Sequence, residues 1–249
     1  MALRRVGTGI FVRFTQGSLH FRIDVKPMID QGSNAISVTL LRGFLMGAMR
    51  VLFRIEHRGL GNIPGNGPLV IAPNHVTYFD PFWVGVPMRR AVCFMAWDKI
   101  FTIPVAGRIL RWLGAFPVSL VNPESSAYKT ALRVLKGGKA LMVFPEGGRS
   151  ADGRLQPFKE GAARLALKTG ATVLPVAIHG GENVWSPKMW FPRPRKVRVE
   201  YLEPISCPRF EPGSKEEFEA AAATLTSEIR VAIESRLQIS DLRPQTNDE

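Results

Sequence analysis

His75 and Asp80 are the residues whose types and spacing most directly indicate chemistry. Histidine titrates near neutral pH, so it can act as a general base and take a proton from a hydroxyl group. Asp80 follows five positions later, and through a tight turn its carboxylate could hold the other imidazole nitrogen and stabilise the charged ring. The reacting hydroxyl would then belong to the substrate. Because Asp80 precedes Pro81, capping of a helix is an alternative role for this aspartate.

The segment 143–150 is a second polar cluster at the end of a hydrophobic run. Gly147 and Gly148 would let the backbone approach a ligand closely. Arg149 offers a planar fork that suits a phosphate group, and Glu146 could accept a hydrogen bond from a hydroxyl or orient an arginine. The segment predicts a substrate-binding turn, and a solvated surface turn with a Glu–Arg pair is the alternative.

Two further residues have less specific surroundings. Lys99 precedes a predicted helix, where it could hold a phosphate as a point charge or be an ordinary surface lysine. His179 follows the apolar segment 173–178, and we expect it to be a structural residue rather than a second base.

The elements that must position these residues alternate between short apolar strands and amphipathic helices. The pattern predicts an α/β fold with a mixed, largely parallel sheet covered by helices, in which reactive loops follow the strands. The expected strands are 69–72, 92–96, 140–144, 172–178 and 197–202, and the expected helices are 81–86, 105–113, 125–135, 159–168 and 214–237.

Four regions follow from this pattern. Residues 1–33 have no helical period and are expected to form a poorly ordered or extended leader. Residues 34–56 predict an amphipathic helix, 57–238 a catalytic domain, and 239–249 a disordered tail.

The predicted helix 34–56 has an apolar face and basic residues on its polar side, a pattern typical of helices that lie in a lipid interface. Packing against the protein's own core is the alternative. The residues assigned to membrane docking are Leu41, Phe44, Leu45, Leu52, Arg50 and Arg54.

The overall charge also indicates an anionic partner, because the chain has a net charge of +12 and a pI near 10.3. No nucleic-acid-binding motif is present, and the aromatic and basic tract 185–196 fits a membrane surface. No run of about 18 uncharged apolar residues occurs, so attachment is expected to be peripheral or monotopic. The two cysteines give no disulfide framework and favour a reducing compartment.

Taken together, the segments 75–80, 99–114, 144–150 and 173–180 resemble the glycerolipid acyltransferase family in their order and spacing. The similarity covers roughly 57–205 and is greatest to bacterial-type 1-acylglycerol-3-phosphate acyltransferases. It implies that the donor is acyl-CoA or acyl-carrier protein and that the product is phosphatidic acid. It implies that His75, helped by Asp80, deprotonates the acceptor, and that Glu146 and Arg149 bind the glycerol phosphate. It further implies docking on the cytoplasmic face of the inner membrane, with no metal and no cofactor.

Two departures from the family pattern concern the acceptor. Gly148 occupies a position where the family usually has threonine, and the region of Leu120 lacks an arginine that often grips phosphate in the family. The headgroup therefore stays open, with lyso-ornithine lipid and lysophosphatidylglycerol as alternatives. A metal-dependent lipid hydrolase is the alternative from a different class.

Overall fold

A mixed seven-stranded sheet forms the centre of the protein, in the order β4-β10-β9-β5-β8-β6-β7. The neighbours from β9 through β7 are parallel, while β10 is antiparallel to β9 and parallel to β4. The prediction of a mixed, largely parallel sheet is therefore confirmed. The strands are β4 (Glu56–Arg58), β5 (Leu69–Pro73), β6 (Val92–Trp97), β7 (Ala115–Val118), β8 (Ala140–Met142), β9 (Thr172–His179) and β10 (Arg198–Tyr201).

This computed structural model describes residues 4–5, 10–15, 18–23, 35–118, 126–150, 152–185, 188–211 and 213–241. The described parts of the expected leader are β1 (Arg4–Arg5), β2 (Ile10–Thr15) and β3 (Ser18–Ile23), which pair as an antiparallel sheet. Most of the expected tail, residues 242–249, and the region of Leu120 lie outside the described residues.

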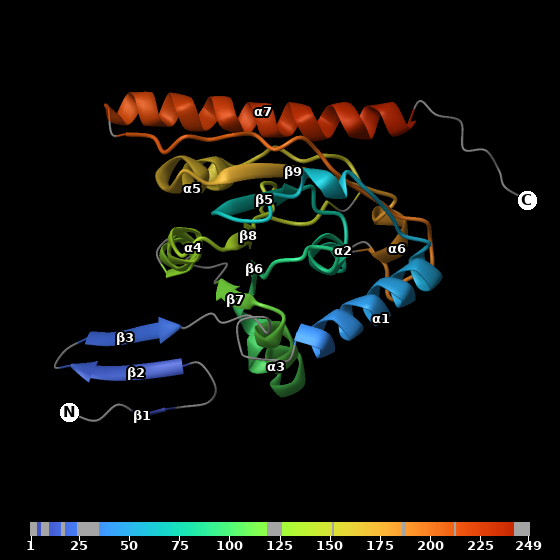
Figure 1. Ribbon diagram of the computed structural model, residues 1–249, viewed down its shortest axis with the longest axis horizontal. Helices are drawn as coiled ribbons and strands as arrows, with labels where there is room; N and C mark the ends of the chain where they lie inside the picture. The colour runs from blue at the N-terminus through green and yellow to red at the C-terminus, as the bar shows by residue number, and fades with distance from the viewer. Residues whose placement is uncertain are drawn as a thin grey trace, which may run out of the picture.

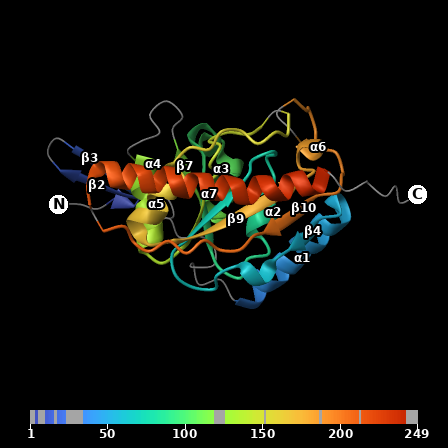
Figure 2. The ribbon, with the colours of Figure 1, turned by 90° about the horizontal axis from the view of Figure 1, so that it is seen from above.

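The helices pack on both faces of the large sheet. In Figure 1, α4 and α5 lie on one side of the strands and α1 and α2 on the other. Figure 2 shows α7 crossing the molecule above the sheet. The helices are α1 (Ala35–Phe53), α2 (Asp80–Gly85), α3 (Pro104–Trp112), α4 (Ser126–Lys136), α5 (Gly161–Thr169), α6 (Glu182–Trp185) and α7 (Lys215–Asp241), with 3-10 turns η2 (Leu60–Asn62) and η3 (Asp98–Thr102).

The long helix α7 begins at a capping box. The Glu217 N–H donates to Ser214 Oγ at 3.1 Å, and the Ser214 N–H donates to Glu217 Oε2 at 2.9 Å. These reciprocal bonds satisfy two N–H groups that a helix start would otherwise leave without partners. The sequence pattern predicted this start, whereas it missed the short elements β4, β7 and α6.

Successive residues of the central strands contribute to two separate cores. Val70 and Ala72 of β5 belong to the core under α4, α5 and α7, while Leu69 and Ile71 belong to the core under α1 and α2. This alternation follows from the two-residue period of a strand. Because both faces are covered, the strand is apolar at every position, which explains why it appears in the sequence as a continuous hydrophobic run.

The parallel strands also determine where the chemistry is. The carboxyl ends of β9, β5, β8 and β6 lie at the same edge of the sheet. His179 is the last residue of β9, and the segments that follow β5, β8 and β6 carry His75, the turn 144–150 and Lys99. Ligand sites in open α/β sheets form at this edge.

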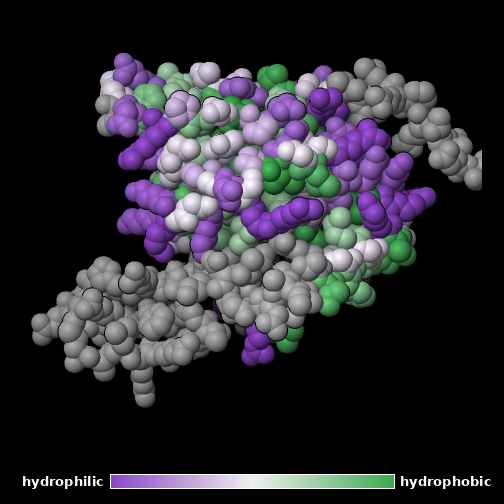
Figure 3. Space-filling model, viewed as in Figure 1, coloured by the Kyte–Doolittle hydropathy of each residue, from purple (hydrophilic) through white to green (hydrophobic). Residues whose placement is uncertain are grey.

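Some apolar side chains of helix α1 pack on the core, and others are exposed to solvent. Met49 is buried, and Leu45 and Phe53 pack against the same core. Leu45, which the helical pattern grouped with the lipid-facing residues, therefore contacts the protein itself because it lies one turn from Met49. Phe44, Val51 and Leu52 are 72%, 81% and 56% exposed, and Figure 3 shows hydrophobic side chains gathered along this helix.

Three other residues of the predicted helix 34–56 are assigned to membrane docking, and the side chains of two of them are described. Arg50 and Arg54 are exposed, whereas the side chain of Leu41 lies outside the described part of the chain. Within the described ranges, no helix has both the length and the apolar character needed to cross a bilayer.

Candidate active site

The loop after β5 brings His75 and Asp80 together. His75 Nδ1 lies 2.8 Å from Asp80 Oδ2, a distance at which an Nδ1–H donates a hydrogen bond to the carboxylate. The same Asp80 oxygen accepts the backbone N–H groups of Val76 at 2.8 Å and Thr77 at 2.9 Å. The imidazole Nε2 makes no hydrogen bond with any described residue, and 16% of the His75 side chain is exposed. The histidine therefore offers one nitrogen to a substrate.

Asp80 stabilises this loop rather than the helix that follows it. Helix α2 begins at Asp80, and its N-terminus has no side-chain cap, so the capping alternative is wrong. Asp80 is completely buried, and its Oδ1 has no hydrogen-bond partner among the described residues. Burial raises the pKa of Asp80, and the hydrogen bonds from His75, Thr77 and Val76 oppose that rise.

Glu146 connects the second polar cluster to the histidine. Its Oε1 accepts the backbone N–H of His75 at 2.6 Å, and its Oε2 accepts the backbone N–H of Gln156 at 2.8 Å. Burial raises the pKa of Glu146, while these two N–H groups stabilise its charged form. We expect Glu146 to contact the substrate or an arginine; in the structure each of its oxygens accepts a backbone N–H, and no described arginine forms an ion pair with it.

A second hydrogen bond joins the two segments: the Ser150 N–H donates to the His75 carbonyl at 2.8 Å. The imidazole also stacks on Phe144, with ring centroids 3.8 Å apart. The side-chain amide of Asn74 also exchanges two hydrogen bonds, of 2.7 and 3.0 Å, with the backbone of Ile178 on the neighbouring strand β9. The histidine loop is thus fixed to the ends of both adjacent strands.

The two glycines of the turn have different surroundings. Gly147 has a φ of +71°, and a Cβ there would lie 2.8 Å from the Lys159 ammonium nitrogen. Its lack of a side chain allows both the turn and the close approach of Lys159. A Cβ at Gly148 would meet nothing within 4 Å, so the threonine that is usual in the family would fit there.

Arg149 lies over the ring of Tyr78, with its guanidinium carbon 3.5 Å from the ring centroid. Its Nε is buried without a hydrogen-bond partner, and its guanidinium forms no ion pair with any described residue. The alternative of a solvated Glu–Arg pair is therefore wrong, since Glu146 is occupied by backbone. A guanidinium that lies on the ring of Tyr78 in the histidine loop, and that has no ion-pair partner among the described residues, suits an anionic ligand.

Lys99 and His179 lie at the same edge of the sheet as His75. Lys99 is exposed in η3, and its ammonium lies 5.4 Å from the centre of the Trp97 ring. His179 Nε2 lies 3.8 Å from Glu200 on β10, which fits the structural role that the sequence predicted.

The sequence-based assignment missed three side chains at this site: Phe144, Tyr78 and Lys159. Tyr78 lies between the histidine and the aspartate, and Phe144 begins the second segment. Their positions within the two segments were a usable signal. No local pattern indicated Lys159, because its approach to Gly147 depends on the tertiary fold.

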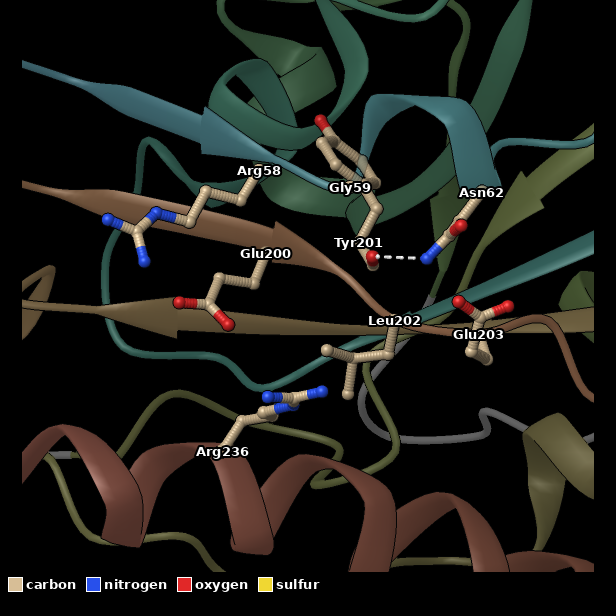
Figure 4. A pocket seen from close by; sticks show the side chains of 8 residues that line it. All are labelled: Arg58, Gly59, Asn62, Glu200, Tyr201, Leu202, Glu203 and Arg236. Carbon is tan, nitrogen blue, oxygen red and sulfur yellow. Dashed lines mark hydrogen bonds between the residues drawn. The ribbon is translucent and has the colours of Figure 1, made fainter.

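A separate pocket of about 250 Å³ lies at the β10 side of the sheet (Figure 4). Arg58, Glu200, Glu203 and Arg236 are among its lining residues, and none of these residues comes from the segments 74–80 or 144–150. Within the described part of the chain, no cluster of three or more histidine, cysteine, aspartate or glutamate side chains could hold a metal ion. The histidine loop and the glycine turn therefore remain the candidate active site.

This fold and site define an α/β protein with a histidine–aspartate pair at the carboxyl edge of its parallel strands. The chain matches the family model described as Acyltransferase over residues 54–179, about half its length. The chain therefore belongs to the acyltransferase family.

Relatives within this family have a common activity in their names. The chain is 34% identical over 131 residues to chloroplastic 1-acyl-sn-glycerol-3-phosphate acyltransferase BAT2 of Brassica napus, covering 51% of this chain and 38% of that protein. It is 27% identical over 182 residues to 1-acyl-sn-glycerol-3-phosphate acyltransferase of Borreliella burgdorferi, covering 72% and 70%. The chain thus spans less than half of the plant relative but most of the bacterial one.

A solved structure shows the same fold. The crystal structure of the 1-acyl-sn-glycerophosphate (LPA) acyltransferase PlsC from Thermotoga maritima superposes with a TM-score of 0.65 at 26% sequence identity. The match covers 83% of this chain and 81% of that one.

Proposed function

We propose that this chain transfers a fatty acyl group from a thioester donor to the free hydroxyl of 1-acylglycerol-3-phosphate, giving phosphatidic acid. The observation that carries the proposal is the His75–Asp80 bond of 2.8 Å, which leaves Nε2 without a partner among the described residues. Arg149, on the adjoining turn, lies on the ring of Tyr78 and forms no ion pair with any described residue. A hydroxyl needs a base to become a nucleophile, and a phosphate needs a cation. The names of the relatives support the same acceptor.

In the proposed reaction, His75 Nε2 takes the proton of the acceptor hydroxyl as its oxygen attacks the thioester carbonyl carbon. The imidazole becomes positively charged, and the Asp80 carboxylate stabilises that charge through Nδ1–H. When the carbon–sulfur bond breaks, the imidazolium returns the proton to the leaving thiolate. The products are the ester and a free thiol, and the enzyme is regenerated without a cofactor.

The substrate contacts follow from the same geometry. Arg149 binds the acceptor phosphate with its free N–H groups, and Lys99 adds positive charge at the same edge of the sheet. Gly147 and Gly148 leave the backbone open to the glycerol unit. Glu146 acts indirectly, by holding the backbone N–H of His75 at 2.6 Å. The donor is acyl-CoA or acyl-carrier protein.

Peripheral attachment to an anionic membrane surface completes the proposal. Both substrates carry long acyl chains, and extraction into water costs about 0.8 kcal/mol for each methylene. Helix α1 has exposed apolar residues and the exposed Arg50 and Arg54. Such a helix suits the cytoplasmic face of the inner membrane, where anionic headgroups attract basic residues.

A product assay tests the reaction. The purified full-length chain would be incubated with one acyl-CoA and a panel of acceptors: lysophosphatidic acid, lysophosphatidylglycerol, lyso-ornithine lipid and monoacylglycerol. We expect phosphatidic acid as the main product and a strongly reduced rate of product formation by the His75→Ala variant. Preferred acylation of another lyso-lipid would reassign the acceptor, and release of free fatty acid alone would contradict acyl transfer.

A further inference from the structure

We infer that Tyr78 is a positioning residue for acceptor recognition: its ring holds the Arg149 guanidinium in the orientation that receives the phosphate, and Trp185 holds the ring. This inference rests on the proposed function, because it takes Arg149 as the ligand of the acceptor phosphate. It gives Tyr78 a role in substrate affinity rather than in the proton transfer.

The first support is the way in which the arginine lies on the ring. The Arg149 guanidinium carbon is 3.5 Å from the Tyr78 centroid, close enough for a cation–π contact. A guanidinium that lies over a ring uses its face and leaves the N–H groups at its planar edge free. Those groups match two oxygens of a phosphate. The buried Arg149 Nε has no hydrogen-bond partner, and within the described part of the chain the Tyr78 ring is the contact that restrains the cation.

The second support is that Tyr78 is itself held in place. Its ring lies 4.6 Å from the ring of Trp185, centroid to centroid. Trp185 packs on Phe79 at 5.3 Å and donates its indole N–H to the Met189 carbonyl at 3.2 Å. A ring restrained in this way restrains the arginine above it, so less conformational freedom is lost when the phosphate binds.

The third support is the connection to the base. Tyr78 lies in the loop between His75 and Asp80, and Arg149 precedes Ser150, whose N–H donates to the His75 carbonyl at 2.8 Å. The cation and the base therefore belong to one connected unit. An arginine oriented on Tyr78 would place the glycerol hydroxyl at a fixed distance from the imidazole.

Tyr78 uses its ring and not its hydroxyl. The side chain is 39% exposed, and its hydroxyl makes no hydrogen bond with any described residue. Phenylalanine should therefore replace it, whereas an aliphatic residue should not. This contrast supplies a conservative control.

The test is steady-state kinetics of the full chain with one acyl-CoA, with lysophosphatidic acid or monoacylglycerol as the acceptor. We expect Tyr78→Leu to raise the KM for lysophosphatidic acid about five- to thirtyfold, the equivalent of one cation–π contact. The kcat and the KM for acyl-CoA should stay near their wild-type values. Tyr78→Phe should restore the low KM, and Tyr78→Met, which keeps the apolar bulk, should behave like Tyr78→Leu if the latter folds poorly by circular dichroism.

A double-mutant cycle separates positioning from general disturbance. In an Arg149→Ala background, Tyr78→Leu should raise the KM for lysophosphatidic acid no further, because the restrained cation is gone. A full additional loss, or an equal change in both KM values, would overturn the inference. If the wild-type chain acylated monoacylglycerol as efficiently as lysophosphatidic acid, the proposed function would fail and the inference with it. An unchanged KM in Tyr78→Leu alone would overturn only the inference.

Discussion

At the scale of single residues, His75 is held at every polar group except Nε2. Its backbone N–H and carbonyl are bonded to Glu146 and Ser150, its Nδ1 to Asp80, and its ring stacks on Phe144. Because the proposed base is restrained in this way, it would need little reorganisation when a hydroxyl arrives. The buried carboxylates of Asp80 and Glu146 contribute to this restraint. Their hydrogen bonds offset the free-energy cost of removing the two groups from water.

The first prediction concerns the base. His75→Ala should lower the rate of acyl transfer by about 10²–10⁴, the usual contribution of a general base. Because the His75 backbone would still bond to Glu146 and Ser150, the fold should survive. The measurements are kcat by product formation and folding by circular dichroism. Near-wild-type turnover by a folded variant would contradict the mechanism.

The second prediction compares the two glycines of the turn. Gly147→Ala should lower the free energy of unfolding by about 1–2 kcal/mol, because its φ of +71° is costly for alanine and its Cβ would meet Lys159. Gly148→Ala, one position away in open space, is the matched control and should have little effect. Urea unfolding of both variants checks this difference, and equal effects would contradict both the backbone strain at Gly147 and the approach of Lys159.

At the scale of elements, α1 is both a core helix and an exposed apolar surface. Its residues one turn apart, Leu45, Met49 and Phe53, contact the core, and Phe53 packs on Phe79 and Trp83 beside the histidine loop. Among the described side chains of α1, the large apolar ones that remain exposed are Leu40, Phe44, Val51 and Leu52. The proposed contact with lipid therefore does not require the helix to leave the protein.

The third prediction tests that exposed surface. Replacing Phe44, Val51 and Leu52 together with serine should release the protein from anionic liposomes, because each side chain loses several apolar groups that would otherwise lie in lipid. Salt should release the wild-type chain only in part, since ions screen the contribution of Arg50 and Arg54 but not the apolar one. Co-sedimentation measures both effects.

The control for this variant is Val231→Ser on α7. It removes an apolar side chain that is likewise exposed, at 60%, but lies on another helix. It should sediment with liposomes like the wild type. If the α1 variant also sediments like the wild type while folded, membrane attachment must reside elsewhere.

At the scale of the whole molecule, stability depends on groups that only the packed fold buries. His57 on β4 lies between the core and α2, and its Nε2–H donates to the Trp83 carbonyl at 3.0 Å. Its Nδ1 is buried with no partner among the described residues. Burial lowers the pKa of His57, and the nearby Arg50 lowers it further.

The fourth prediction follows from that shift. Because the folded pKa of His57 is below the unfolded one, the unfolded chain binds more protons as the pH falls below about 6.5. The contribution of neutral His57 to stability is therefore complete above that pH and is lost as the pH falls through its folded pKa. His57→Gln, which keeps a donor for Trp83, should lose less free energy of unfolding than the wild type between pH 7.5 and 5.5. Urea unfolding at both pH values measures the difference, and parallel losses would show that His57 is not responsible.

The sequence by itself determined the α/β class, the positions of most strands and helices, and the pairing of His75 with Asp80. These are local properties, because hydrophobic period, turn residues and a five-position spacing all act within a few residues. The same local signals missed β4 and β7. Those strands are short, and neighbouring strands in the sheet rather than their own pattern hold them in place.

Only the tertiary structure decided what Glu146, Arg149 and Leu45 contact. Glu146 meets the backbone of a residue 71 positions away, Arg149 meets Tyr78 from a different loop, and Leu45 meets the core instead of solvent. A helical pattern identifies apolar residues but not which of them a particular sheet covers. Contacts between distant segments depend on how parallel strands bring their carboxyl ends to one edge, and this arrangement exists only once the sheet has formed.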